Sequence, residues 1–144
     1  MFKNLVVYRV SGPDGTPWHA DLSTLEEGLG KARFLPCGTT QPMAIGWVPP
    51  RDPSAAETGA DTGMAPLAES VGGQWLMRLV IEQKVLPSAV VKRRTQELAR
   101  QLEQTTGRKP GKKQSKELKE EAVLALLPQA FTKQASVNVW LDTR

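Results

Sequence analysis

Hydrophobic and polar residues alternate most regularly in two segments of this chain. Between Gln74 and Leu86, apolar side chains at positions 75, 77, 79 and 81 are interspersed with charged ones. A similar period of two runs from Ala135 to Thr143. Because successive side chains of a strand point to opposite faces of a sheet, both segments are predicted to be strands.

Two shorter apolar runs are also predicted to be strands. The run Phe2–Val10 is rich in Val, Leu and Tyr and is followed by the turn residues of Ser11–Gly15. The run Ile45–Val48 ends at two consecutive prolines, which cannot continue a ladder of hydrogen bonds. We expect the strands at Phe2–Arg9 and Ile45–Val48 to pair with the one at Gln74–Leu86.

A helical period of hydrophobic residues follows Pro87. Val91, Leu98 and Leu102 lie on one side of a helix that runs to about Thr106, and Gly107 is a natural stop. A second helix is predicted from Ser115, acting as N-cap, to Leu127, because Pro128 ends it. Its last turns, Ala122–Leu127, are apolar on all sides and are therefore expected to be buried.

A short helix is predicted near the N-terminus, with Ser23 or Thr24 as N-cap and its end near Arg33. The predicted order is then β, α, β, β, α, α, β. This order indicates a single α+β domain over residues 1–144, with a mostly antiparallel sheet and two or three packed helices. The Ala-, Gly- and Thr-rich segment 52–70 is expected to be a flexible surface loop.

The distribution of charge divides the chain into an acidic and a basic half. The chain has 144 residues, of which 40% are hydrophobic and 24% charged, and its formal net charge is +4. Residues 1–75 carry a net charge of −3, whereas residues 76–144 carry +7. Within the basic tract Lys84–Lys119 the only acids are Glu97, Glu103 and Glu117. Such a tract indicates a polyanionic partner.

We therefore take the basic residues of this tract as candidate nucleic-acid-binding residues. They would neutralise phosphates and need not read bases, so binding is expected to be independent of sequence. The alternative is a solvated helical face held by pairs such as Arg93–Glu97. The candidates are Lys92, Arg93, Arg94, Arg100, Arg108, Lys109, Lys112, Lys113 and Lys116.

Little in the sequence indicates an enzyme. The chain has one histidine, His19, expected in a surface loop, and one cysteine, Cys37, expected to be a buried and unreactive thiol. Together they cannot complete a zinc site, so we expect no metal and no cofactor. The segment Gly107–Lys113 lacks the glycine spacing and the following Ser or Thr of a phosphate-binding loop.

No membrane-spanning run or signal peptide is apparent, and a cytoplasmic location is expected.

Phe131 is the remaining candidate residue, just past the end of a predicted helix and two residues before Lys133. It is either a core aromatic residue or an exposed apolar contact with DNA or with another subunit.

Several segments together resemble the N-terminal portion of the RdgC family of recombination-associated proteins. Each is short, but all occur in the family's order from residue 2 to residue 143. They are Phe2–Leu5 with Val7–Arg9, Phe34 with Pro36–Gly38, Gly46–Pro50, Lys84–Ser88 with Val90–Lys92, Leu126–Pro128 with Ala130–Phe131, and Trp140–Thr143.

The resemblance implies a nucleoid-associated protein without catalytic activity that binds double-stranded DNA with little sequence preference. It also implies a homodimer that closes into a ring with a positively charged hole, and restraint of strand exchange promoted by RecA. Phe131 matches a family phenylalanine at the end of the Leu-Leu-Pro segment. The alternative function is a protein-interaction or dimerisation module, in which Leu126–Phe131 binds a partner and the charges only maintain solubility.

Overall fold

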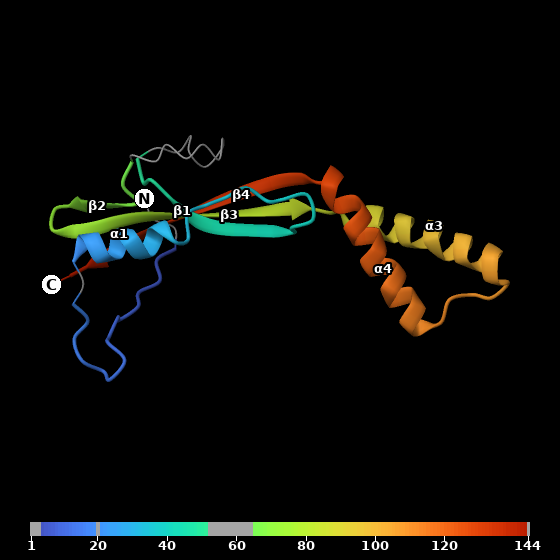
Figure 1. Ribbon diagram of the computed structural model, residues 1–144, viewed down its shortest axis with the longest axis horizontal. Coiled ribbons are helices and arrows are strands. Elements are labelled where there is room, and N and C mark those ends of the chain that lie inside the picture. The colour runs from blue at the N-terminus through green and yellow to red at the C-terminus, as the bar shows by residue number, and fades with distance from the viewer. Residues whose placement is uncertain (1–3, 20, 52–64, 144) are drawn as a thin grey trace.

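The sheet is built around one long central strand. The computed structural model describes residues 4–19, 21–51 and 65–143. Strand β3 (Gln74–Val85) pairs antiparallel with β1 (Met43–Val48) and β2 (Ala68–Val71) along one edge, and with β4 (Phe131–Asp142) along the other. Figure 1 shows this narrow sheet and the helices at its two ends. The predicted α+β class with an antiparallel sheet is confirmed.

The predicted strand at Phe2–Val10 is wrong for the part that the structure describes. Residues 4–10 form no strand, and Leu5, Val7 and Tyr8 are exposed. Both edges of the expected partner, β3, are taken by β1, β2 and β4. An apolar run forms a strand only where an edge is open to receive its hydrogen bonds.

The predicted loop 52–70 contains a strand at its C-terminal end. Residues 52–64 lie outside the described residues, whereas Ala68–Val71 forms β2 and pairs with β3. The two strands are joined by Gly72 and Gly73, both with positive φ (60° and 82°), as in a type I′ hairpin turn. A pair of glycines before an alternating run is the sequence signal for such a hairpin, and it identifies β2.

Helix α1 (Leu22–Gly30) covers one face of the sheet near its β2 end. Its N-cap is Asp21, whose Oδ1 accepts from Thr24 N at 2.7 Å, so the predicted N-cap, Ser23 or Thr24, lies too late in the chain. The helix also ends before the predicted Arg33. Its Leu29 packs with Leu67, Ala68 and Met77.

The opposite face is covered by the segment that follows α1. Phe34 is buried against Val48 and Val80, and its N donates to Trp47 O at 2.9 Å. This close approach requires Gly46, because a Cβ at that position would overlap the backbone of Phe34. Glycine in the Gly46–Pro50 segment is therefore a packing requirement.

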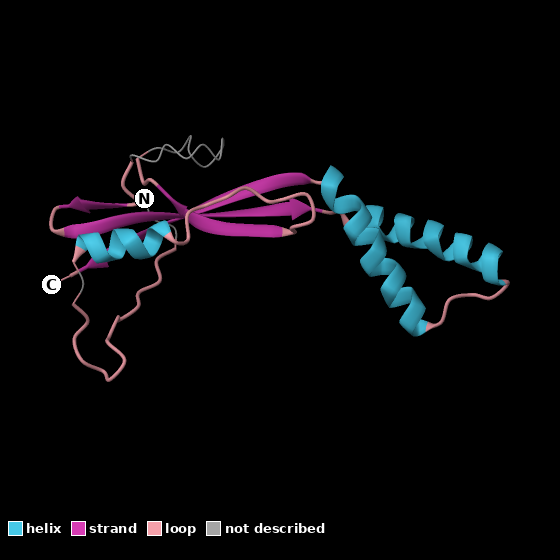
Figure 2. Cartoon of the chain, in the orientation of Figure 1, coloured by secondary structure: helices cyan, strands magenta, loops and turns pink. Residues whose placement is uncertain are grey.

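The other two helices form an antiparallel pair that projects from the far end of the sheet (Figure 2). We call α3 (Ser88–Thr106), α4 (Lys112–Leu126) and their connection the helical arm. Helix α3 has the predicted bounds, and Gly107 ends it with φ 69°. Helix α4 begins at Lys112, three residues before the predicted cap Ser115, because Gly111 is its N-cap.

The end of α4 is less buried than its apolar sequence suggested. Ala122 and Leu127 are buried, but Leu124 is 57% exposed. A short 3₁₀ turn, η1 (Leu127–Gln129), contains Pro128 and leads into β4. Strand β4 starts four residues before the predicted Ala135.

Candidate nucleic-acid interface

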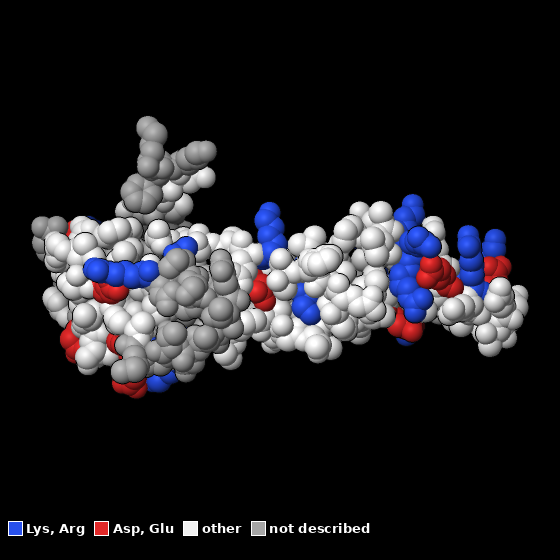
Figure 3. Space-filling model, turned by 90° about the horizontal axis from the view of Figure 1, so that it is seen from above, with Lys and Arg blue, Asp and Glu red and all other residues white. Residues whose placement is uncertain are grey.

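All nine candidate DNA-binding residues lie on the helical arm. Helix α3 carries four, with Arg93 and Arg100 on the side opposite its buried stripe. Eight of the nine are exposed and Arg94 is half-buried. Figure 3 shows Lys and Arg side chains gathered over the arm, with acidic side chains among them. The candidates are Lys92, Arg93, Arg94 and Arg100 on α3, Arg108 and Lys109 in the connection, and Lys112, Lys113 and Lys116 on α4.

Four of these cations lie at the end of the arm that is farthest from the sheet. We call residues 107–113 the arm tip; it holds Arg108, Lys109, Lys112 and Lys113 and no acidic residue. All four are exposed, and none makes an ion pair with another described residue. The left-handed Gly107 ends α3 and Gly111 is the N-cap of α4, so these basic residues lie in the connection and in the first turn of α4.

Three other candidates are paired with acids on the arm. Arg93 and Arg94 share Glu97, at 3.4 and 3.3 Å, and Lys116 lies 3.9 Å from Glu120. The pairs expected of a solvated helical face are thus present here. Exposed ion pairs of this kind contribute little free energy, so a phosphate can replace the carboxylate at small cost.

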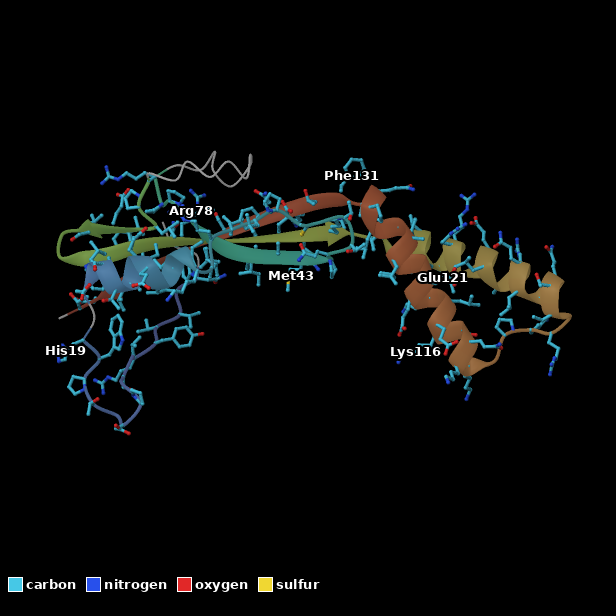
Figure 4. All side chains as sticks on the ribbon, viewed as in Figure 1. His19, Met43, Arg78, Lys116, Glu121 and Phe131 are labelled. Atoms are coloured by element: carbon cyan, nitrogen blue, oxygen red, sulfur yellow. The ribbon has the colours of Figure 1, made fainter. Side chains whose placement is uncertain are left out.

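Phe131 is exposed, and the core alternative is wrong. It is the first residue of β4, and 87% of its surface is accessible. Figure 4 places it where α4 leads into β4, at the base of the arm. The second alternative, an apolar contact with DNA or with another subunit, stays a prediction.

The two residues considered for catalysis, His19 and Cys37, are not hydrogen-bonded to each other. His19 is exposed in the loop before α1. Burial, with the hydrogen bond and charge of Glu82, raises the pKa of the half-buried Cys37 thiol, which opposes reactivity. Among the described residues, no group of three His, Cys, Asp or Glu side chains could hold a metal ion. No described helix is long and apolar enough to cross a membrane.

Sequence reasoning missed a polar cluster at the base of the arm. Lys84, which marked only the start of the basic tract, donates from Nζ to Thr39 O at 2.8 Å and to Leu127 O at 2.9 Å. Glu82, two residues earlier on β3, is buried and accepts from Cys37 N at 2.6 Å and from Gln134 Nε2 at 2.7 Å. The only signal for this cluster in the sequence is that Glu82 and Lys84 lie at alternate positions of a strand. Such a pair ordinarily indicates a face of the sheet that is exposed to solvent.

Comparison with known proteins decides the family. A family model described as "Putative exonuclease, RdgC" matches residues 1–144. The chain belongs to the RdgC family. The predicted resemblance is therefore confirmed over the whole chain.

Curated relatives carry the name recombination-associated protein RdgC. The chain is 41% identical to the RdgC of Dechloromonas aromatica over 143 residues, 99% of the chain, and 38% identical to that of Cupriavidus necator over 141 residues. The RdgC of Bordetella pertussis is 36% identical over 142 residues. In each case the match covers 42% of the relative, so the chain spans about two fifths of the length of these proteins.

Proposed function

We propose that this RdgC-family chain binds double-stranded DNA through the helical arm, without sequence preference. The observation that carries the proposal is the arm tip, where four exposed cations lie without an acidic partner among the described residues. The nine basic residues of the arm then form the DNA-binding surface, with the arm tip contacting phosphates first.

Phosphate contact explains why this surface needs charge but no fixed base-reading side chains. Each Lys or Arg that neutralises a phosphate releases condensed counterions, and this release drives binding to any sequence. The arm holds its cations on two packed helices, so they are presented together without the cost of ordering a loose tail. The ion pairs to Glu97 and Glu120 moderate the charge along the helices and leave the arm tip as the most basic part.

The biological consequence follows from the relatives, which are named recombination-associated proteins. We propose that the chain acts in recombination on nucleoid DNA by occupying duplexes, and so restrains strand exchange promoted by RecA. It acts by binding and not by catalysis. A strand-exchange reaction with RecA tests this, and the chain should slow product formation in proportion to the duplex it occupies.

Self-association is part of the same proposal. We propose a homodimer that closes around DNA, with Phe131 as an apolar contact at the base of the arm. Its 87% exposure supports this role, because the ring is accessible to a second subunit. The second candidate, an interaction module without DNA contact, rests on the same exposed residue.

A salt titration tests the DNA proposal. Binding to a fluorescent duplex is measured by anisotropy at several salt concentrations, for the parent chain and for a Lys109→Ala, Lys112→Ala, Lys113→Ala variant. The matched control, Arg9→Ala, Lys31→Ala, Arg51→Ala, removes the same charge outside the arm. The arm variant should bind more weakly, and its slope of log K against log salt should be shallower by about 0.9 for each phosphate that is no longer neutralised.

Two outcomes would count against the proposal. Equal slopes for the arm variant and the control would show that net charge, and not the arm, attracts DNA. Absence of binding by the parent at low salt would favour the interaction module. The word exonuclease in the family description is tested separately, with end-labelled duplex and Mg²⁺, and we expect the DNA to remain intact.

A further inference from the structure

The helical arm is joined to the sheet by few interactions. Among the described residues, extensive contacts occur within the sheet and between α3 and α4, but none of comparable extent joins either helix to the sheet. Figure 1 shows the arm extending beyond the last residues of β3. Two short connections, residues 86–87 and 127–130, attach it. Such connections alone leave the direction of the arm free to vary.

One side chain joins these parts. Lys84 is the penultimate residue of β3, and its ammonium donates to the carbonyl of Leu127 at 2.9 Å. Leu127 follows the last residue of α4, where unpaired carbonyls carry the negative end of the helix dipole. The same ammonium donates to Thr39 O at 2.8 Å, in the segment before β1. One charged group therefore ties together the sheet, this segment and the end of α4.

The surroundings of Lys84 hold it in place. Its backbone N donates to Pro42 O at 2.9 Å, and Leu127 is buried. The buried carboxylate of Glu82 lies on the same face of β3 and is itself held by Cys37 and Gln134. A positive charge beside a buried carboxylate and a helix C-terminus is favoured in this position.

We infer that Lys84 is a positioning residue: it fixes the direction of the helical arm relative to the sheet, and thereby the place of the arm tip. Its effect on the arm is independent of DNA, whereas the consequence for DNA affinity rests on the proposed function. The ammonium of Lys84 is engaged with two carbonyls, so Lys84 is not expected to contact phosphate itself.

The direction of the arm is measured by the distance between two spin labels. In a Cys37→Ala background, labels at Ser70→Cys on β2 and Gln104→Cys on α3 report the sheet-to-arm distance, since both positions are exposed. Pulsed electron resonance should give one narrow distribution for this parent. Lys84→Met, which keeps the length but not the donors, should broaden it, and Lys84→Arg should restore it.

The charge-matched control is Lys31→Met, which removes an exposed lysine at the end of α1. It should leave the distance distribution unchanged. Circular dichroism verifies that Lys84→Met is folded; if it is not, Lys84→Gln, which retains a donor, takes its place. A distribution as narrow in the folded variant as in the parent would overturn the inference.

DNA binding provides a readout that separates this inference from the proposed function. Lys84→Met should weaken duplex binding about three- to tenfold, because the arm must then be ordered on binding. The salt slope should stay within about half a unit of the parent slope, since the same phosphates are neutralised. A salt slope that is shallower by about 0.9 in Lys84→Met would show that Lys84 itself neutralises a phosphate, which would contradict its assignment as a positioning residue. A parent that binds no DNA refutes the proposed function but leaves the distance measurement decisive for Lys84.

Discussion

Glu82 shows how a charged residue becomes structural when its partners are supplied by distant segments. Its carboxylate is buried on β3 and accepts hydrogen bonds from Cys37 N and Gln134 Nε2. Burial is the largest influence and by itself raises the pKa of Glu82. The hydrogen bonds from Gln134 and Cys37 and the charge of Lys84 outweigh it, so the pKa lies below its ordinary value.

This lowered pKa makes stability dependent on pH. Because the folded chain holds the Glu82 proton less tightly than the unfolded chain, the carboxylate stabilises the fold above the unfolded pKa of about 4.3. The stabilisation disappears as the pH falls through the lower, folded value. We expect Glu82→Gln to lower the free energy of unfolding by about 1–3 kcal/mol at pH 7, and by less as the pH falls below about 4. Urea unfolding at several pH values measures this.

The control for Glu82 is an exposed glutamate of the same charge. Glu27 forms only a surface pair with Lys31, and its side chain is 74% exposed. Glu27→Gln should change the free energy of unfolding by no more than about 0.5 kcal/mol. A difference between parent and Glu82→Gln that does not vary with pH would contradict the lowered pKa.

A comparison of Phe131 with Phe34 distinguishes a residue that contacts another subunit from a residue of the hydrophobic core. Phe131 is 87% exposed and Phe34 is 6% exposed. Phe131→Ala should leave the free energy of unfolding within about 0.5 kcal/mol of the parent but reduce self-association in sedimentation velocity. Phe34→Ala should cost about 3–5 kcal/mol. A large stability loss in Phe131→Ala would place that ring in a core.

At the scale of elements, local signals predicted the helices better than the strand partners. The bounds of α3 follow from Pro87 and Gly107, which act within one turn of the helix ends. The predicted start of α4 lies too late because Ser115 is a better capping residue by type than Gly111. In the structure the Ser115 hydroxyl donates to Gly111 O at 2.9 Å, inside the first turn. Gly111 N donates to Gln114 Oε1 at 3.1 Å, so a local capping contact accompanies the earlier start.

Gly107 tests how far the end of α3 depends on one backbone conformation. Its φ of 69° is strained for other residues, while an added Cβ would meet no atom within 4 Å. Gly107→Ala should therefore cost about 1–2 kcal/mol through backbone strain alone. Gly107→Asn should cost less, because asparagine tolerates the left-handed region. Thermal unfolding of the two variants measures this, and equal losses would point to a steric cause instead.

At the scale of the whole molecule, the shape separates the charges. Helix α1 lies at the β2 end of the sheet, and the basic arm lies beyond the other end (Figure 1). The long hydrogen-bonded ladder of β3 and β4 spans the distance between them. Although the net charge of the whole chain is only mildly positive, the helical arm at one end of the molecule is strongly basic.

The elongated shape has a measurable consequence. A compact chain of 144 residues has a radius of gyration of about 15 Å. Because the arm extends past the sheet, the monomer should exceed this value clearly in small-angle X-ray scattering coupled to size exclusion. A monomer radius near 15 Å would mean that the arm folds back onto the sheet in solution.

The sequence by itself determined the features that depend on neighbouring residues. These are the α+β class, the strand predicted at Gln74–Leu86 and found at Gln74–Val85, the helix from Ser88 to about Thr106, and the concentration of positive charge after Lys84. Periodicity and capping act over a few residues, and charge is a property of composition, so both can be read along the chain.

Only the tertiary structure decided which apolar segments find partners and which charges remain free. It left residues 4–10 without a strand partner, exposed Phe131 and engaged Lys84 with two carbonyls. It also left the four cations of the arm tip without an ion pair to another described residue. Burial, edge pairing and ion pairing depend on residues far away in sequence. A pattern in one segment cannot specify them, because the same residue is exposed to solvent or paired with another residue depending on which segments pack against it.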